Sequence, residues 1–365
     1  MSAWNRWKLL WAYLRGRDDV RALPVEYIVE TTAKCNIYCP MCPRESHPQP
    51  KEDMDEAVFR KLVAESAGTA EHMMLIGLGE PLLDPRIFDR IHHCAEHGIS
   101  ALISTNGTLL DEKASRRLLD SPLSHITLSF DGYSKETFEH YRKGAKFERV
   151  RDNFVRFCRM KAERGSKMVV TVQMVRMDGN RHEEEAFRAF WRAVPGVDLI
   201  RVKDDETNLL GGEAQRTLSR KCHYLWRGAM YVKHNGDVYP CCQSYMLDGE
   251  PVGSLARQSL REIFNSEPMR RMRRMHAAGR GGEIGICARC CTAIPHPLLA
   301  AGSLILHGHI VRALLPWVER WSTRLAEGKL LDKPVRSRPE PLVQLAAGPG
   351  TAAGAPQARP GRPEP

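Results

Sequence analysis

The 365-residue sequence has no long hydrophobic run. The apolar stretch at residues 298–306 is far too short for a membrane-spanning helix, and a mean hydropathy of -0.40 excludes a polytopic membrane protein. The N-terminus lacks a secretory signal, because Trp4, Trp7 and Trp11 interrupt its apolar residues and no small-residue cleavage site follows. With 42% hydrophobic residues the chain is not wholly disordered, and its length allows one large domain and a smaller one.

Disulfide bonds are not expected, although the sequence contains 11 cysteines. Without a secretory signal we expect the chain to stay in the reducing cytosol, where clustered cysteines are metal ligands or redox groups. The cysteines fall into one group of Cys35, Cys39 and Cys42, a second group of Cys222, Cys241, Cys242, Cys287, Cys290 and Cys291, and two isolated residues, Cys94 and Cys158.

The chain alternates short β-branched runs with longer amphipathic stretches, which indicates an α/β protein with a parallel sheet, either doubly wound or curled into a barrel. Both architectures place their chemistry at the carboxyl ends of the strands. The predicted strands are 27–32, 72–78, 99–105, 125–130, 168–175 and 197–202, and helical patterns include 55–66, 84–98 and 147–165. We predict a basic aromatic N-terminal segment (1–24), an α/β domain (25–205), a cysteine-rich domain (206–296) that opens with a linker, an apolar C-terminal segment (297–333) and a disordered tail (334–365).

The first cysteine group has the spacing C-x3-C-x2-C and follows the first predicted strand. Three thiolates in one loop suit a 4Fe-4S cluster with one iron left open for another ligand. A zinc site is the alternative, with His47 as its fourth ligand.

This spacing in the first strand-to-helix loop resembles the signature of the radical S-adenosylmethionine (SAM) superfamily. The resemblance covers about residues 25–296 and implies a partial (β/α)6 TIM-like barrel followed by a small cysteine-rich auxiliary-cluster domain. It implies that Cys35, Cys39 and Cys42 bind a 4Fe-4S cluster whose open iron chelates SAM. Reductive cleavage of SAM then gives a 5'-deoxyadenosyl radical that abstracts hydrogen from a substrate. Met41, before the last cysteine, is similar to a family residue that packs near the adenine.

The segment GLGEP, Gly77–Pro81, resembles the family's GGEP motif, which implies that Gly79 and Glu80 bind the amino group of SAM. Asn106 and Ser129 end the third and fourth predicted strands, and by the same resemblance they lie near the ribose and the carboxylate of SAM.

Arg142 is similar to a family arginine that pairs with the carboxylate of SAM, which its planar guanidinium suits. The alternative is a solvated arginine at a helix end. Asp131, after the fourth strand, is expected to cap the following helix.

The second cysteine group has the pattern C-x13-G-x4-C, a long gap and C-x2-C. It resembles the extensions called SPASM and twitch, close to the 2-deoxy-scyllo-inosamine dehydrogenase type, which implies an auxiliary 4Fe-4S cluster. Six cysteines are too few for two fully ligated auxiliary clusters. The expected ligands are Cys222, Cys241, Cys287 and Cys290, with Cys242 or Cys291 as substitutes. A zinc ribbon or buried, redox-inert cysteines are the alternatives.

The net charge of +10 lies outside the predicted barrel. Residues 25–205 carry 27 basic and 29 acidic residues, whereas the charge is +3 over 1–24, +5 over 206–291 and +4 over 292–365. The arginine-rich run at 269–280 suits compensation of cluster charge or a solvated helix better than nucleic-acid binding, because no aromatic residues are interleaved with the arginines.

We therefore predict a radical SAM enzyme that oxidises a polar small molecule, such as a sugar or aminocyclitol, with an external one-electron donor such as flavodoxin or ferredoxin. A peptide or protein maturase is the alternative; the roughly 24 residues before the barrel are too few for a leader-peptide-binding domain. An iron-sulfur or zinc regulator that binds nucleic acid is an alternative from another class. We expect a cytoplasmic protein, and the two ends of the chain, with Trp317 and Trp321, suggest attachment to the inner face of the membrane.

Overall fold

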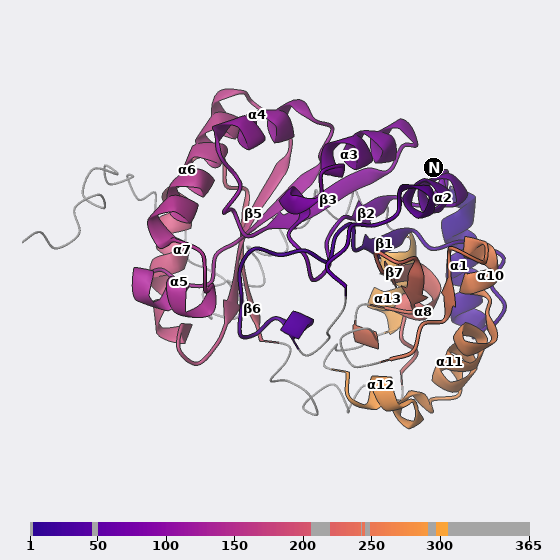
Figure 1. The fold of residues 1–365 in the computed structure, drawn as a ribbon. Coiled ribbons are helices and arrows are strands. Elements are labelled where there is room, and N and C mark those ends of the chain that lie inside the picture. Colours follow the sequence, from indigo (N-terminus) through magenta and orange to yellow (C-terminus); the bar gives the residue numbers. More distant parts are fainter. Residues whose placement is uncertain are drawn as a thin grey trace, which may run out of the picture. The chain divides into compact units, whose positions relative to one another are not determined.

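The computed structural model describes residues 3–45, 50–205, 220–241, 243–244, 249–290 and 297–305. Its centre is one mixed sheet with the strand order β6-β5-β4-β3-β2-β1-β7-β8-β9 (Figure 1). Strands β1 to β6 are parallel in the order of the sequence, as predicted, and do not close on themselves within this sheet. The strands are β1 Glu26–Val29, β2 His72–Met74, β3 Ser100–Thr105, β4 His125–Ser129, β5 Val169–Arg176, β6 Leu199–Asp204, β7 Gly228–Val232, β8 Asp237–Tyr239 and β9 Gly253–Ser254.

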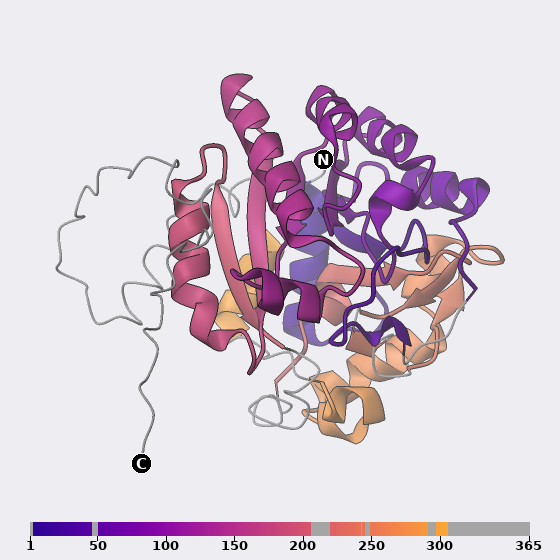
Figure 2. The same ribbon diagram turned by 60° about the vertical axis from the view of Figure 1, so that its left-hand side comes forward.

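Helices between the parallel strands cover the outer face of this sheet (Figures 1 and 2). Aspartate or serine side chains cap several of them; Asp55, for example, accepts hydrogen bonds from two backbone N–H groups at the start of α2. The helices are α1 Ala3–Arg15, α2 Glu56–Ser66, α3 Ile87–Glu96, α4 Glu112–Asp120, α5 Lys135–Tyr141, α6 Phe147–Glu163, α7 Glu184–Ala193, α8 Tyr224–Arg227, α10 Leu260–Phe264, α11 Glu267–Ala277, α12 Gly285–Ala288 and α13 Pro297–Ile305.

The two faces of the sheet differ in chemistry because side chains alternate along each strand. On β3, Ala101 and Ile103 are buried in the main core, whereas Leu102 and Ser104 are partly exposed on the other face. The same alternation recurs on β4. The helices therefore bury the outer face, and the partly exposed inner face is left for ligands.

The cysteine-rich region continues this sheet. Strand β7 pairs parallel to β1, and β8 and β9 follow antiparallel. All described residues belong to one compact unit, Met1–Ser322. The predicted linker at 206–220, except for Arg220, lies outside the described residues, as do the predicted tail and Trp317 and Trp321. The boundaries of the predicted segments therefore stay predictions.

Helices α1 and α13 come from opposite ends of the described chain and pack against each other. The Arg6 guanidinium of α1 donates to the carbonyl of Leu304, 2.9 Å away, and Ala300 and Leu304 are buried. Within the described residues, no helix combines the length and the apolar character needed to cross a bilayer.

Candidate functional site

The first cysteine group lies in the loop that leaves the carboxyl end of β1. Cys35, Cys39 and Cys42 are partly buried free thiols, and the Cys42 N–H closes a turn on the carbonyl of Cys39 at 2.9 Å. The pKa of Cys39 is raised to about 11, mainly by burial; the charges of Asp131, Cys42 and Cys35 add to this rise and the charge of Arg142 opposes it. The three sulfur atoms are therefore close enough to repel one another when ionised, which is the arrangement that a shared cationic metal centre stabilises. His47 lies outside the described residues, so the zinc alternative is not tested.

The GLGEP loop after β2 packs directly on the cysteine loop. A Cβ atom on Gly79 would lie 2.1 Å from the carbonyl oxygen of Thr32 and 2.8 Å from that of Lys34. The Glu80 N–H donates to the Lys34 carbonyl at 2.7 Å. A glycine is required here because any side chain would separate the two loops.

Glu80 turns its carboxylate into the protein. Its oxygens accept hydrogen bonds from the Thr105 hydroxyl and the Asn106 N–H, both at 2.7 Å, and from the Leu82 N–H at 3.1 Å. Burial raises the pKa of Glu80 although these bonds favour its charged form. The carboxylate therefore ties the GLGEP loop to the end of β3, and the predicted contact with the SAM amino group stays a prediction.

Asn106 lies beside the first cysteine. Its side-chain amide is 3.9 Å from the Cys35 sulfur and donates to the Asn36 side-chain oxygen at 3.0 Å. Ser129, at the end of β4, lies on the inner face, where its hydroxyl is 3.2 Å from that of Ser104. The structure thus places both residues at the carboxyl edge of the sheet that carries the cysteine loop.

Arg142 is buried, with 7% of its surface exposed, so the alternative of a solvated arginine is wrong. Its guanidinium donates to the Asp131 carboxylate at 2.6 Å, and its Nε atom is buried without a hydrogen-bond partner. The charges of Asp131 and Cys39 raise the pKa of Arg142 against the effect of burial. Arg142 therefore lies near the cysteine loop and has a hydrogen-bond donor, its Nε atom, that no protein group uses.

Met41 is partly buried within the cysteine loop.

Asp131 does not cap the helix that follows it, contrary to the expectation from sequence. Its second carboxylate oxygen accepts from the Val175 N–H at 2.7 Å, and Ser134 caps α5 instead. Asp131 is fully buried, so its charge serves to hold Arg142 and the end of β5.

The second cysteine group gathers at the opposite edge of the sheet. Cys222 precedes α8 and the start of β7, and Cys241 follows β8, which runs antiparallel to β7. Burial raises the pKa of Cys287 to about 12, with further contributions from the charges of Cys222 and Cys290. These three thiols are therefore close enough to interact electrostatically, and their binding of a shared cluster stays a prediction. Cys242 and Cys291 lie outside the described residues.

One ring nitrogen of His276, on α11, is 3.5 Å from the Cys287 sulfur. The arginines of α11 mostly face protein groups. Arg273 is fully buried and donates to the backbone carbonyl of Leu225 in α8, and burial lowers the pKa of Arg273 to about 9. Arg270 and Arg274 pair with acidic residues of the loop before β1. These contacts attach α11 to its neighbours and leave no open basic patch for nucleic acid among these three residues.

Sequence reasoning missed a buried polar cluster at the carboxyl ends of β1 and β7. Glu30 is fully buried and accepts hydrogen bonds from the Tyr231 hydroxyl at 2.7 Å and the Leu78 N–H at 3.2 Å, and a His234 ring nitrogen lies 2.8 Å away. Burial raises the pKa of Glu30, but these partners together lower it below its ordinary value. The cluster supports the GLGEP loop from the other side. The only signal in the sequence is an acidic residue at the end of an apolar strand.

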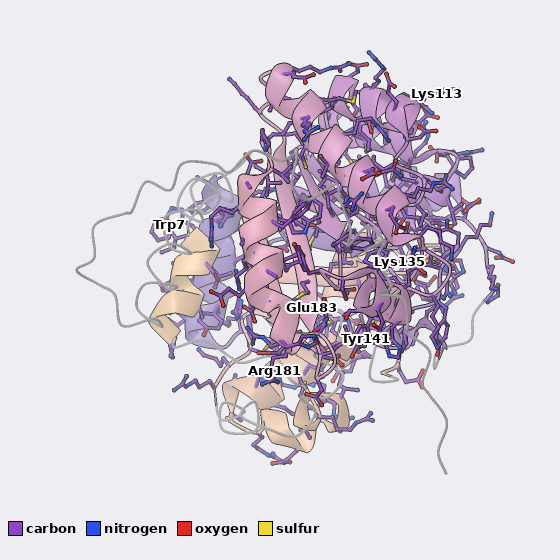
Figure 3. All side chains as sticks on the ribbon, turned by 90° about the vertical axis from the view of Figure 1, so that its left-hand side faces the viewer. Trp7, Lys113, Lys135, Tyr141, Arg181 and Glu183 are labelled. Atoms are coloured by element: carbon purple, nitrogen blue, oxygen red, sulfur yellow. The ribbon has the colours of Figure 1, made fainter. Side chains whose placement is uncertain are left out.

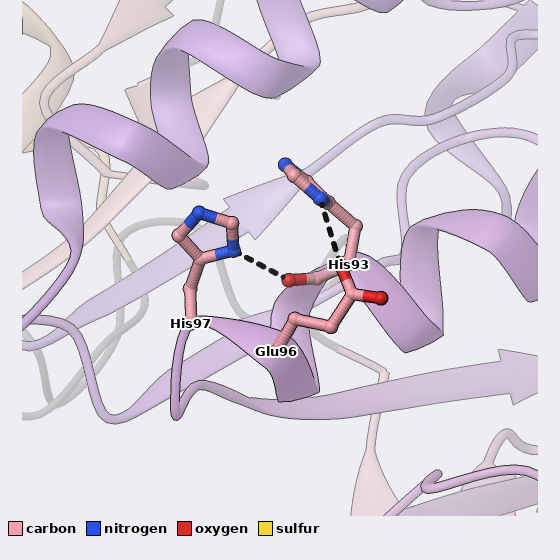
Figure 4. A group of neighbouring side chains, drawn as sticks. All are labelled: His93, Glu96 and His97. Atoms are coloured by element: carbon pink, nitrogen blue, oxygen red, sulfur yellow. Dashed lines mark hydrogen bonds and ion pairs between the residues drawn. The ribbon is translucent and has the colours of Figure 1, made fainter.

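A further group of possible metal ligands lies at the C-terminal end of α3. His93 and His97 are one helical turn apart, with Glu96 between them (Figure 4). His93 lies 3.4 Å from the Glu96 carboxylate, and the His97 Nδ1 atom is 2.9 Å from the His93 carbonyl. These contacts stabilise the C-terminal end of α3, where imidazole side chains interact favourably with the last backbone carbonyls of the helix. We assign them that structural role.

Comparison with known proteins gives two family matches. A model of the radical SAM superfamily matches residues 29–190, and a model of an iron-sulfur cluster-binding domain, SPASM, matches residues 222–291. The GTP 3',8-cyclase of Chlorobaculum tepidum is 33% identical over 129 residues, which are 34% of this chain and 39% of the cyclase. The dTDP-4-amino-4,6-dideoxy-D-glucose ammonia-lyase of Streptomyces venezuelae is 32% identical over 141 residues, 36% of this chain and 28% of the lyase. The chain therefore spans less than half of these relatives.

Among solved structures, that of Streptococcus suis SuiB bound to the precursor peptide SuiA has a TM-score of 0.56 at 14% identity, covering 77% of this chain and 72% of SuiB. This similarity concerns the fold alone. The radical SAM match begins in β1 and ends in α7, and the SPASM match begins at Cys222 and extends past Cys290. Because the two matches account for both cysteine groups, the chain belongs to the radical SAM superfamily and carries a C-terminal SPASM domain.

Proposed function

We propose that this protein is a radical SAM oxidoreductase that abstracts hydrogen from a polar small molecule, such as a sugar or aminocyclitol derivative. The radical SAM domain implies a 4Fe-4S cluster and SAM, and the SPASM domain implies auxiliary iron-sulfur binding. When bound, these groups supply a 5'-deoxyadenosyl radical that takes a hydrogen atom from the substrate, and an acceptor for one electron from the resulting substrate radical.

The described cysteines fit these groups. Cys35, Cys39 and Cys42 are free thiols in one loop, which matches a cluster that leaves one iron open. We propose that Gly79 exposes backbone carbonyls to the amino group of SAM while Glu80 holds their loop in place. Arg142 has a buried, unpartnered Nε atom, which suits the carboxylate of SAM.

The observation that carries the substrate class is a polar row on the inner face of the sheet. Ser129 of β4 pairs in register with Gln173 of β5, and Gln173 pairs with Arg201 of β6. Two residues earlier along these strands, Thr127 pairs with Thr171, and Leu199 of β6 ends that second row. Side chains at paired positions of neighbouring strands point to the same face. The inner face of β4 to β6 therefore carries hydroxyl, amide and guanidinium groups that suit a substrate rich in oxygen.

Arg201 narrows the expected substrate further. Its side chain is exposed and forms no hydrogen bond or ion pair within the described residues, whereas its backbone pairs with Gln173 of β5. A guanidinium in this position is suited to a carboxylate or phosphate of the substrate. The two curated relatives act, by their names, on a nucleotide and on a nucleotide-linked sugar, which supports a polar, anionic small molecule.

The auxiliary site is proposed to use Cys222, Cys241, Cys287 and Cys290, with Cys242 or Cys291 as substitutes. The charges of Cys222 and Cys290 contribute to the raised pKa of Cys287, which supports a shared centre. The auxiliary site lies at the amino edge of the sheet, opposite the first cysteine loop. This position suits an electron acceptor for a substrate that is bound along the inner face. An external one-electron donor, such as flavodoxin or ferredoxin, would reduce the first cluster.

A peptide substrate is the second candidate, favoured by the fold similarity to the peptide-bound SuiB. The polar row and Arg201 favour the small molecule, because hydroxyl, amide and guanidinium side chains match an oxygen-rich anionic substrate. For the cellular location we propose the cytoplasm, because the radical SAM and SPASM domains imply iron-sulfur clusters whose cysteine ligands suit a reducing compartment.

The first experiment is anaerobic reconstitution with iron and sulfide, followed by dithionite and SAM. Release of 5'-deoxyadenosine is expected, together with about eight iron atoms per chain for two clusters. Cys39→Ala should abolish the release, whereas Cys94→Ala should keep it because Cys94 is buried in the core of the α3 region. A Cys39→Ala protein that still cleaves SAM would refute the radical SAM assignment of this loop.

The second experiment tests the substrate class. Sugar phosphates, nucleotide sugars, aminocyclitols and short peptides are added separately, and substrate-dependent 5'-deoxyadenosine is measured. An anionic polar small molecule should stimulate release, and Arg201→Gln should raise its KM with little change in kcat. Arg192→Gln, an exposed arginine of α7, is the matched control. Stimulation by peptides alone would favour the maturase.

A further inference from the structure

Exposed large apolar side chains are concentrated on one surface of the molecule. In the described residues, all of them except Tyr38 lie on α1 or α13. On α1 they are Trp4 at 66% exposure, Trp7 at 53%, Trp11 at 56% and Leu14 at 54%, and on α13 Ile305 at 45%. The α1 residues are spaced three or four apart and form one stripe along the helix. A stripe of this kind on a soluble fold marks a contact with something outside it.

The opposite face of α1 fixes the helix, so the stripe cannot turn inward. The Asn5 side chain exchanges two hydrogen bonds with the backbone of Leu23, at 2.8 and 3.1 Å. Arg6 forms a buried ion pair with Glu71, just before β2. Tyr13 packs edge-on against Trp226, with ring centroids 5.6 Å apart. Figure 3 shows Trp7 on the outer side of α1, beside α13.

The charge of this surface has one sign. Besides the stripe and Ala3, the exposed residues of α1 are Lys8 and Arg15. The Lys8 ammonium lies 5.6 Å from the Trp4 ring and the Arg15 guanidinium 4.4 Å from the Trp11 ring. Neither α1 nor α13 contains an acidic residue.

We propose that this surface, Trp4, Trp7, Trp11, Leu14, Lys8 and Arg15 together with the exposed end of α13, docks onto an anionic phospholipid membrane. Tryptophan prefers the boundary between headgroups and acyl chains, and flanking basic residues are attracted to anionic lipid. A second copy of the chain fits less well. In a symmetric dimer Lys8 and Arg15 would meet the same residues of the partner without acidic groups to neutralise them.

The position of the surface is compatible with catalysis. Helix α1 is anchored at Leu23 and Glu71, before β1 and β2, and so lies at the amino edge of the sheet. The cysteine loop of the radical SAM domain leaves the carboxyl edge. Docking through α1 therefore leaves that edge accessible to SAM and to an electron donor.

The test uses the full-length, reconstituted protein and vesicles of phosphatidylcholine alone or of equal parts phosphatidylcholine and phosphatidylglycerol. Co-flotation with the anionic vesicles is expected, with a blue shift of tryptophan fluorescence. The variant Trp4→Gln, Trp7→Gln, Trp11→Gln should bind at least about tenfold more weakly. Lys8→Gln with Arg15→Gln should weaken binding about thirtyfold, since each basic residue near an anionic surface contributes about fivefold. Lys113→Gln with Arg181→Gln is the charge-matched control and should bind normally: both residues are exposed, Lys113 in α4 and Arg181 in the turn between β5 and α7, elements that lie on the other side of the sheet from α1 in Figure 1.

Circular dichroism and 5'-deoxyadenosine release check that each variant is folded and active. The proposal is overturned if the wild-type chain does not float with anionic vesicles, or if the tryptophan variant floats as well as the wild type. It is also overturned if analytical ultracentrifugation shows a wild-type dimer that the tryptophan substitutions dissociate. Another contrary result would be that acrylamide does not quench the fluorescence of Trp4, Trp7 and Trp11. In either case the stripe would be covered by protein. None of these results bears on the radical SAM chemistry.

Discussion

Asp131→Asn tests how the candidate SAM site holds its buried arginine. Asp131 is fully buried, and its oxygens bind the Arg142 guanidinium at 2.6 Å and the Val175 N–H at 2.7 Å. An asparagine can still accept from Val175, but its amide group then points donors at the guanidinium of Arg142. Removing one partner of a buried ion pair leaves an uncompensated charge, so the free energy of unfolding should fall by about 3–5 kcal/mol.

The matched control is Asp120→Asn. The Asp120 carboxylate lies at the same distance, 2.6 Å, from the guanidinium of Arg164, but its side chain is 67% exposed. Solvent screening limits such a pair to under about 1 kcal/mol. Urea unfolding of the apo proteins, followed anaerobically by circular dichroism, compares the two substitutions.

Two further results sharpen this test. Asp131→Asn combined with Arg142→Met removes both charges and should recover part of the lost stability. In the reconstituted protein the cost of Asp131→Asn should be smaller, because ionised Cys35 and Cys39 also stabilise the charge of Arg142. Equal costs for Asp131→Asn and Asp120→Asn would refute the idea that Arg142 is a buried cation held by Asp131.

Three other substitutions probe the loops around this site. Gly79→Ala puts a Cβ 2.1 Å from the Thr32 carbonyl and should lower SAM cleavage about a hundredfold by displacing the GLGEP loop, whereas Gly302→Ala, with open space around its Cβ, should not. Glu30→Gln should cost about 1–3 kcal/mol at neutral pH. The pKa of Glu30 is lowered in the folded protein, so the charged carboxylate stabilises the fold above the ordinary pKa of 4.5. The difference in unfolding free energy between wild type and Glu30→Gln should therefore shrink as the pH falls below 4.5 and through the lowered pKa. A difference that stays constant with pH would contradict this role of Glu30. Cys39→Ser and Cys287→Ser should each retain about four iron atoms per chain. Full iron content in either variant would show that the substituted cysteine is not a cluster ligand.

The sequence predicts the parallel strands well because their β-branched runs are bounded by turns and amphipathic helices. Their ends are less well predicted. The apolar run 72–78 reads as one strand, but β2 ends at Met74 and the following residues form the approach to the GLGEP loop. The contact with the cysteine loop decides this, since it needs Gly79 against the Thr32 carbonyl, and no periodicity within the run reports it.

Side-chain partners across the sheet were beyond sequence reasoning for a topological reason. Glu30 and His234 are more than 200 residues apart and meet only because β7 joins the sheet beside β1. A parallel neighbour could equally have been sought at the free edge of β6. The wrong prediction that Asp131 caps a helix has a similar origin. Capping a nearby helix is the local expectation for an aspartate, whereas its actual partners, Arg142 and Val175, come together only after β4, α5 and β5 pack.

The position of β7 also explains how one sheet can serve two cysteine groups. Since β7 is parallel to β1, the chain enters it at the amino edge, and the antiparallel β8 returns the chain to that edge. Cys222 and Cys241, before and after this hairpin, are therefore brought to the edge opposite Cys35. The polar row of the inner face lies on the strands that join the two edges. Because β3, β2 and β1 lie between that row and β7 in the strand order, a substrate that is to reach both cysteine groups, as the proposed function requires, has to extend across the inner face as well as along it.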